Sequence, residues 1–185
     1  MFKTLKRKHL TISDHKTGTN VMNTSEIESI LQRNEAVRDT FLGVYALDRL
    51  PSKLELDDIR REQESIGLPN RWFLICNCCP SAKIGRHWVA MFSDNGSVEF
   101  FDSFAQPPNV YNDGYLIKFL TEASEGRDVI YNIEPLQAIE TDACGHYCIV
   151  YGVARSLGVP FNSFINEMSS LTRDNLIKFV VSTLF

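Results

Sequence analysis

Residues 140–148, with the sequence ETDACGHYC, hold two cysteines four residues apart beside a glycine and a histidine. Cys144 comes at the start of segment 143–155, which is apolar on almost every side and so predicts a buried central helix, capped by Thr141 or Asp142. The amino end of a helix carries about half a positive charge and stabilises a thiolate, the reactive form of cysteine. Backbone N–H groups there can donate to a developing oxyanion. The pattern therefore indicates a nucleophile at Cys144.

A cysteine nucleophile needs an acid–base partner, which in turn needs an orienting group. Both are found on a predicted β-hairpin, because Asn-Gly at 95–96 separates the strand-like runs HWVAMF and SVEFFD, and this dipeptide is a strong hairpin signal. His87 begins the first run and Asp102 ends the second, so the hairpin brings an imidazole toward a carboxylate. Gln137, seven residues before Cys144, offers a side-chain amide for the oxyanion.

Each of these residues also has a purely structural interpretation. A cysteine such as Cys144 is, taken singly, more often a small buried hydrophobe than a nucleophile. His87 can be an ordinary satisfied or exposed histidine, and Asp102 can simply begin a turn. Gln137 can be an unremarkable loop residue. The convergence of a strand-end His, a strand-end Asp and a helix-start Cys-Gly after a Gln favours catalysis over these alternatives.

The three clustered cysteines at 76, 78 and 79 raise the question of a metal site. A zinc site needs two pairs of ligands at suitable spacing. The nearest His or Cys outside the cluster is His87, which already has a role as the acid–base partner. We therefore predict no metal and no other cofactor, and we place these cysteines as reduced thiols in a strand over residues 71–79.

The elements that position these residues predict an α+β fold, an antiparallel-rich mixed sheet packed against helices, with a buried central helix that begins at the nucleophile. Further strands are expected at 87–92, 97–102 and 128–133. Helices are expected from the Thr-Ser-Glu at 24–26, at 54–65, around the apolar face of Tyr115, Leu116, Phe119, Leu120 and Ala123, at 143–155, at 161–169 and at 173–183.

Composition divides the chain into a flexible basic tail, residues 1–22, and a single domain, residues 23–185. Residues 1–16 contain five Lys or Arg and one Asp, in a chain whose net charge is −4. A contact of this tail with nucleic acid is open, although a solvated tail is the favoured interpretation. No apolar run is long enough for a membrane span. An odd number of cysteines without a secretory signal predicts an intracellular, reducing compartment, such as the cytoplasm or nucleus of a host cell, or a virion.

The ordered set His87-Trp88, Asp102, Gln137 and Cys144-Gly145 resembles the cysteine proteases typified by the adenovirus protease, adenain, and more distantly the SUMO-specific proteases. The resemblance covers roughly residues 37–155. It includes Phe-Leu-Gly-x-Tyr at 41–45, the Asn77 that lies ten residues before the histidine, the Phe-Asp-Ser-Phe of 101–104, and Cys148 one helical turn after the nucleophile.

This resemblance implies a role for each matched residue. Cys144 attacks the scissile carbonyl, and His87 forms an ion pair with it and then protonates the leaving amine. Asp102 orients His87, while Gln137 and the Cys144 backbone N–H hold the oxyanion. Trp88 packs beside the histidine and shields it from water. Substrate binding is expected to involve Trp88, Gly43, Tyr45 and Gly145, the last because a glycine lets another chain approach closely.

The resemblance implies a cysteine endopeptidase that cleaves polypeptides after Gly in structural precursors of a virus or virus-like element, as in capsid maturation. The alternatives are an isopeptidase that removes a ubiquitin-like modifier and a catalytically inactive binding module. Six residues separate Gln137 from Cys144, as in adenain, whereas SUMO proteases usually have five. Asp102 stands where adenain has Glu. No cysteine lies between Phe104 and Gln137, which argues against a disulfide-linked activating peptide, and the acidic body argues against DNA as a cofactor.

Overall fold

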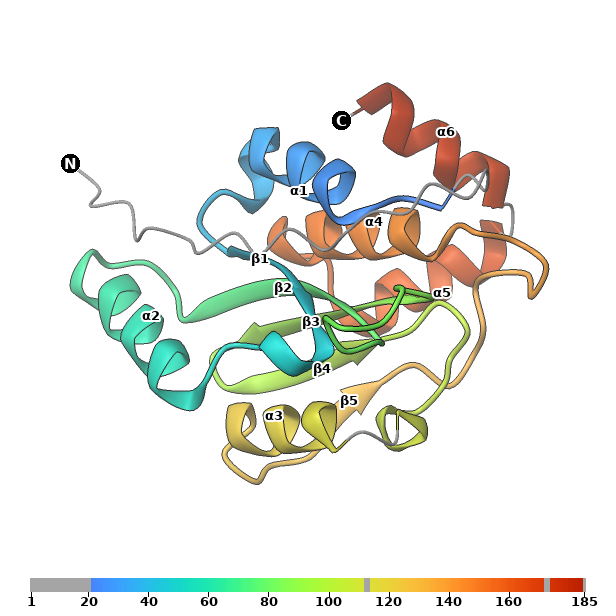
Figure 1. Cartoon of the computed structure of the whole chain (residues 1–185). Helices are drawn as coiled ribbons and strands as arrows, with labels where there is room; N and C mark the ends of the chain where they lie inside the picture. The colour runs from blue at the N-terminus through green and yellow to red at the C-terminus, as the bar shows by residue number, and fades with distance from the viewer. Residues whose placement is uncertain (1–20, 112–113, 172–173, 185) are drawn as a thin grey trace.

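The computed structural model describes residues 21–111, 114–171 and 174–184 (Figure 1). Five strands and six α-helices form the described part of the chain, with three short 3₁₀ turns between them. In chain order they are α1 (Thr24–Arg33), η1 (Glu35–Val37), β1 (Phe41–Ala46), η2 (Leu47–Arg49), α2 (Lys53–Ser65), β2 (Arg71–Asn77), β3 (Trp88–Asp94), β4 (Ser97–Phe101), η3 (Pro108–Val110), α3 (Tyr115–Ala123), β5 (Val129–Tyr131), α4 (Cys144–Ser156), α5 (Phe161–Leu171) and α6 (Asp174–Leu184).

The strands follow their sequence order across one mixed sheet, β1-β2-β3-β4-β5. β2, β3 and β4 pair antiparallel, whereas β1 lies parallel to β2 and β5 parallel to β4. Asn95 and Gly96 both have positive φ, of 50° and 85°, which the tight turn of a two-residue hairpin requires. The predicted hairpin and the predicted α+β class are therefore confirmed.

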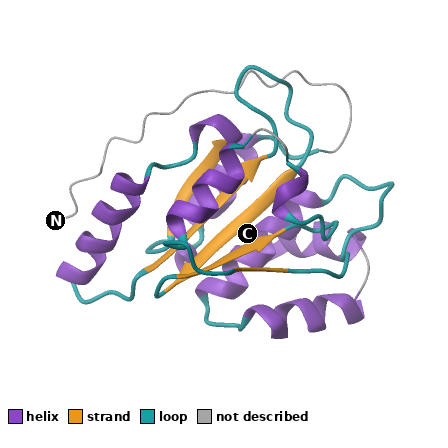
Figure 2. Ribbon diagram, turned by 90° about the horizontal axis from the view of Figure 1, so that it is seen from below, coloured by secondary structure: helices purple, strands orange, loops and turns teal. Residues whose placement is uncertain are grey.

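Helices cover both faces of the sheet (Figures 1 and 2). One apolar core joins α1, α4, α5 and α6 to one face, and a second core joins α2 and α3 to the other. β2 is buried along nearly its whole length, because a central strand with helices on both faces has no solvent side. This explains why the run Arg71–Asn77 is apolar without alternation.

Helix α4 lies in the middle of the first core, as its all-round apolar pattern predicts. It packs against β3 and β2, and Gly152 lies against Phe73 of β2. A Cβ at this position would lie 2.0 Å from Cζ of Phe73. The helix can therefore approach the sheet this closely only where it has no side chain.

Two local predictions were wrong, and one strand was missed. Helix α4 begins after Ala143, without a side-chain cap, because Thr141 and Asp142 interact instead with Asp174 and Lys178 of α6. Strand β2 ends at Asn77, so only the first cysteine of the cluster lies in the strand. The chain turns there because backbone N–H groups of the next two residues donate to the His87 carbonyl and the Asn77 side chain. Strand β1 was not expected.

The predicted basic tail, residues 1–22, lies outside the described residues apart from Val21 and Met22. Met22 is buried and its carbonyl accepts a hydrogen bond of 2.9 Å from the indole of Trp88. The packed part of the chain therefore includes this residue. Helix α1 begins directly afterwards with a capping box between Asn23 and Glu26. No helix in the described ranges is both long and apolar enough to cross a membrane.

Candidate active site

The residues predicted to be catalytic gather at one end of the sheet. His87 directly precedes β3 and Asp102 directly follows β4. Because these strands pair antiparallel, with Ala90 opposite Phe101, the beginning of one lies beside the end of the other. The His87 Nε2 atom lies 2.9 Å from Oδ1 of Asp102. The structure thus brings together the imidazole and the carboxylate that the hairpin predicts.

The Asp102 carboxylate is fully buried and both of its oxygens accept hydrogen bonds. Oδ1 accepts from the Phe104 backbone N–H at 2.8 Å as well as from His87, and Oδ2 accepts from the Tyr111 hydroxyl. Asn132, one residue past β5, accepts from the Asp102 N–H at 3.1 Å and donates to its carbonyl at 2.7 Å. A buried carboxylate held in this way has one orientation.

The His87 ring lies between the carboxylate and the nucleophile and beside two aromatic rings. Its centroid lies 5.0 Å from that of Phe104 and 6.4 Å from that of Tyr111. Burial alone would lower the pKa of His87, but its hydrogen bonds to Asp102 and Cys144 outweigh burial and raise the pKa to about 9. The imidazole is therefore a cation at neutral pH, positioned against a cysteine sulfur.

Cys144 is the first residue of α4 and is buried, with 4% of its surface exposed. Together with Asp102, it is a group that raises the pKa of His87. The neighbouring thiols have different surroundings. Burial foremost raises the pKa of Cys148 and of Cys78 well above the ordinary value, and the Cys148 thiol donates to the Trp88 carbonyl at 3.4 Å. These thiols stay protonated, which distinguishes them from a reactive cysteine.

Gln137 lies buried between the acidic residue and the nucleophile. Its Oε1 accepts from the Ser103 hydroxyl at 2.7 Å, and its Nε2 donates to the Thr141 carbonyl at 2.8 Å. Ser103 follows Asp102 directly, and Thr141 precedes Cys144 by three residues. One hydrogen of the amide Nε2 remains after the bond to Thr141, and it is free to donate to a further acceptor.

Trp88 and Gly145 pack against each other beside the nucleophile. A Cβ at Gly145 would lie 3.3 Å from the Trp88 ring and equally near Met22 and Ile27. That separation is tight, so glycine allows α1, α4 and the indole to meet. The Trp88 side chain is 4% exposed. Its role in shielding His87 from water stays a prediction.

Gly43 and Tyr45 lie farther away, on the edge strand β1. Gly43 pairs with Leu74 in the middle of β2 and has a φ of +143°, a conformation that favours glycine. The Tyr45 ring packs in the core on the α2 and α3 face of the sheet, whereas Cys144 lies on the opposite face. The structure does not bring these two residues to the other site residues, and a role for them in substrate binding stays a prediction.

Sequence reasoning missed three residues that hold the site. Ser103 orients Gln137, Asn132 holds the backbone of Asp102, and Tyr111 holds its carboxylate. Ser103 lies inside the Phe-Asp-Ser-Phe motif but was given no role, and Asn132 lies one residue before the end of the predicted strand at 128–133. The parallel pairing of Phe100 with Tyr131 places it beside Asp102.

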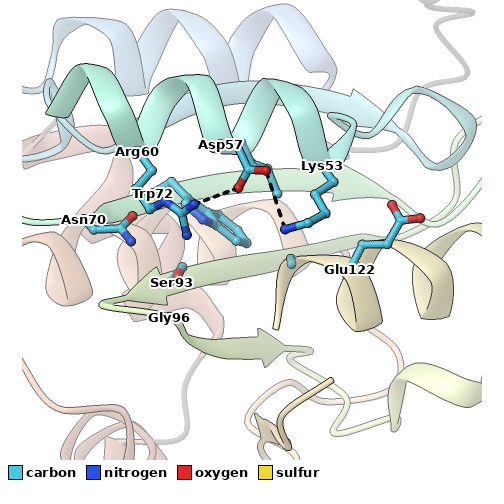
Figure 3. A pocket seen from close by; sticks show the side chains of 10 residues that line it. Lys53, Asp57, Arg60, Asn70, Trp72, Ser93, Gly96 and Glu122 are labelled. Atoms are coloured by element: carbon cyan, nitrogen blue, oxygen red, sulfur yellow. Dashed lines mark ion pairs between the residues drawn. The ribbon is translucent and has the colours of Figure 1, made fainter. Parts of the chain in front are cut away.

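The described residues contain no group of three or more His, Cys, Asp or Glu that could hold a metal ion. All five cysteines are free. A small cavity of about 30 Å³ lies between α2, α3 and the hairpin turn, at the opposite end of the sheet (Figure 3). It has room for about one water molecule. In the lining of this cavity Asp57 forms ion pairs with Lys53 and Arg60. The charges of these three side chains therefore already have partners.

Comparisons with known proteins show which solved structures have a similar fold. No protein-family model and no curated protein matches the chain. Among solved structures, the ASFV pS273R protease is 19% identical, with a TM-score of 0.59 over 89% of this chain and 68% of that one. The SUMO protease Ulp1 is 17% identical, with a TM-score of 0.46 over 87% and 77%. The central domain of Lpg1148 from Legionella pneumophila is 15% identical, with a TM-score of 0.49 over 88% and 95%.

Of these three, the ASFV pS273R protease has a TM-score above 0.5, and it is a protease. The resemblance is therefore confirmed at the level of the fold. The chain has the fold of the ASFV pS273R protease, and its predicted catalytic residues lie on that fold at the end of the sheet where α4 begins. At this identity the similarity concerns architecture, and the chemistry has to be argued from the site.

Proposed function

We propose that this chain is a cysteine endopeptidase in which Cys144 is the nucleophile, His87 the acid–base, Asp102 its orienting group and Gln137 an oxyanion donor. The observation that carries the proposal is the position of the His87 ring, whose Nε2 lies 2.9 Å from Oδ1 of Asp102 and whose pKa is raised by both Asp102 and Cys144. A buried cation between a fixed carboxylate and a cysteine at a helix amino end is the arrangement that maintains a thiolate.

In the proposed reaction the Cys144 thiolate attacks the carbonyl carbon of the scissile peptide bond and forms a C–S bond. The carbonyl electrons move to the oxygen, and the Gln137 amide and the Cys144 backbone N–H donate to this oxyanion. The oxyanion collapses, the C–N bond breaks, and the His87 imidazolium gives its proton to the departing amine. Water then attacks the thioester with His87 as general base, releasing the acid and restoring the thiolate.

We propose that cleavage follows a glycine. Cys144 is only 4% exposed, and at the next residue, Gly145, an added Cβ would lie 3.3 Å from the Trp88 ring, so there is little room for side chains here. A residue without a side chain brings its carbonyl to a buried sulfur at the least steric cost. Together with the motif resemblance, this supports a polypeptide substrate with glycine at the cleaved bond, and viral structural precursors as its source.

The test is a peptide library with Gly-containing sequences, including a fluorogenic Leu-x-Gly-Gly peptide, incubated with the full chain. We expect cleavage after glycine, its loss in Cys144→Ala with an unchanged fold, and faster alkylation of Cys144 than of Cys148. No turnover of linear peptides, but cleavage of a glycine carboxyl joined to a lysine side chain, would instead support the isopeptidase alternative. Equal alkylation rates without any turnover would support an inactive binding module.

A further inference from the structure

Helix α6 contacts the loop that carries Gln137. Asp174, the first residue of α6, accepts from the Thr141 hydroxyl at 2.5 Å and from the Ala138 backbone N–H at 3.3 Å, both through Oδ2. Its Oδ1 lies 2.8 Å from the hydroxyl of Tyr147 on α4. A single carboxylate therefore joins the loop, helix α4 and helix α6.

The other side of the loop is held by Ser103. The backbone N–H groups of Leu136 and Gln137 donate to the Ser103 carbonyl at 2.8 and 3.0 Å, and its hydroxyl donates to the Gln137 side chain. These contacts fix the beginning of the loop and the oxygen end of the amide. The orientation of the Nε2 end of the amide depends instead on its hydrogen bond to the Thr141 carbonyl, at 2.8 Å.

The position of that acceptor depends on Asp174. Thr141 closes a turn by donating its N–H to the Ala138 carbonyl at 3.2 Å. Asp174 accepts from the first and the last residue of this turn, Ala138 and Thr141. The salt bridge between Asp142 and Lys178 joins the next residue of the loop to α6 one helical turn farther on. Movement of the turn away from α6 would shift the Thr141 carbonyl and with it the direction of the Gln137 N–H bonds.

We propose that Asp174 is a positioning residue for the oxyanion hole, which it orders through Thr141 and Gln137 without touching the substrate. This inference rests on the proposed function for its catalytic meaning. Its structural content, the dependence of the Gln137 amide on a carboxylate of α6, stands separately. Helix α6 thereby becomes part of the catalytic apparatus.

The kinetic test combines Asp174→Ala with Gln137→Ala in a double-mutant cycle on the full chain. Loss of one oxyanion donor typically costs about 100-fold or more in kcat. We expect about a 10-fold fall in kcat for Asp174→Ala with KM nearly unchanged, a milder fall for Asp174→Asn, and no change for Ser182→Ala, an exposed control on the same helix. In the Gln137→Ala background, Asp174→Ala should cost less than about 2-fold, because residues that act as one unit are not additive.

An undiminished 10-fold loss in the Gln137→Ala background would overturn the proposal, as would an unchanged kcat in both Asp174 variants. If Asp174→Ala fails to fold, Asp174→Asn takes its place in the cycle. The side-chain amide resonances of Gln137, assigned by their absence in Gln137→Ala, give a readout without turnover. They should shift or broaden in Asp174→Asn and not in Ser182→Ala. Unchanged resonances would refute the positioning role, whereas an inactive wild-type chain would refute only the proposed function.

Discussion

Arg155 of α4 donates to both carboxylate oxygens of Glu99 on β4, at 2.7 and 2.8 Å. Both side chains are buried, the Tyr151 hydroxyl donates to the same carboxylate at 2.7 Å, and the guanidinium lies over the Phe92 ring. Helix α4 begins with the proposed nucleophile, and β4 ends one residue before the proposed orienting acid. The ion pair therefore fixes the two elements that must keep Cys144 and Asp102 in register.

Replacement of Glu99 by leucine should destabilise the fold by about 3–5 kcal/mol, because it leaves the Arg155 cation buried and unpaired. Urea unfolding measures this change. The double variant Glu99→Leu with Arg155→Met removes both charges and should recover most of the loss. A double variant as unstable as the single one would contradict the claim that the uncompensated charge is the cause.

Peptidase activity should fall as the pH rises through about 9, because the raised pKa of His87 marks where the imidazolium loses its proton. The same pKa shift predicts how the free energy of unfolding changes with pH. The folded pKa lies above the ordinary 6.5, so the stabilisation due to protonated His87 is complete below that value and is lost toward and above about 9. The difference in unfolding free energy between wild type and His87→Gln should shrink between pH 6 and pH 10. A constant difference would contradict the ion pair.

The two histidines near Cys144 should respond differently to removal. His87→Ala should lower kcat/KM by at least about 1,000-fold, a size typical of losing a catalytic triad member. His146→Ala should leave it within a few-fold, because burial foremost and then the charges of Lys178, Asp142 and Glu26 determine its pKa, and none of these residues belongs to the proposed site. Its buried Nδ1 has no hydrogen-bond partner among the described residues. Residual activity of His87→Ala that disappears on adding His146→Ala would reverse the assignment.

Tyr111→Phe should reduce kcat by about 10-fold and destabilise the fold by about 1–3 kcal/mol. It removes the hydroxyl that donates to Oδ2 of the fully buried Asp102, and a buried acceptor without its donor carries that cost. Tyr115→Phe, at a half-exposed tyrosine on α3, is the matched control. Equal behaviour of the two variants in kinetics and thermal unfolding would exclude a role for the Tyr111 hydroxyl.

Gly152→Ala should destabilise the protein by about 2 kcal/mol or more, since the added methyl would lie 2.0 Å from the fully buried Phe73 ring. Phe73→Leu in the same chain frees space and should return part of the stability. Denaturant midpoints compare the three variants. Helix propensity alone would make Gly152→Ala more stable than the wild type. That result would mean that Gly152 and the Phe73 ring lie farther apart than described above.

The parts of the fold and site that could be predicted are those with local signals. Asn95-Gly96 specifies its own turn, and that turn alone brings His87 and Asp102 together. The all-round apolar pattern of α4 predicts that the helix is buried, and Cys144 is its first residue.

The rest depends on pairings that no local pattern carries. Strand β1 contains Gly43, and its parallel pairing with β2 is made across the intervening α2. Tyr111 reaches Asp102 from a turn, and Asp174 reaches the oxyanion loop from 33 and 36 residues away along the chain. Thr141 and Asp142 have side chains that could cap a helix, but they contact Asp174 and Lys178 of α6 instead.

The hydrogen bond from the Trp88 indole to the Met22 carbonyl has a practical consequence for anyone shortening the chain. Helix α1, with its complete capping box, suggests Asn23 as a natural cutting point. A protein trimmed there would lose the backbone oxygen that accepts this hydrogen bond, and the tryptophan would gain freedom to turn. Assays of the proposed activity should therefore keep Met22 in the chain.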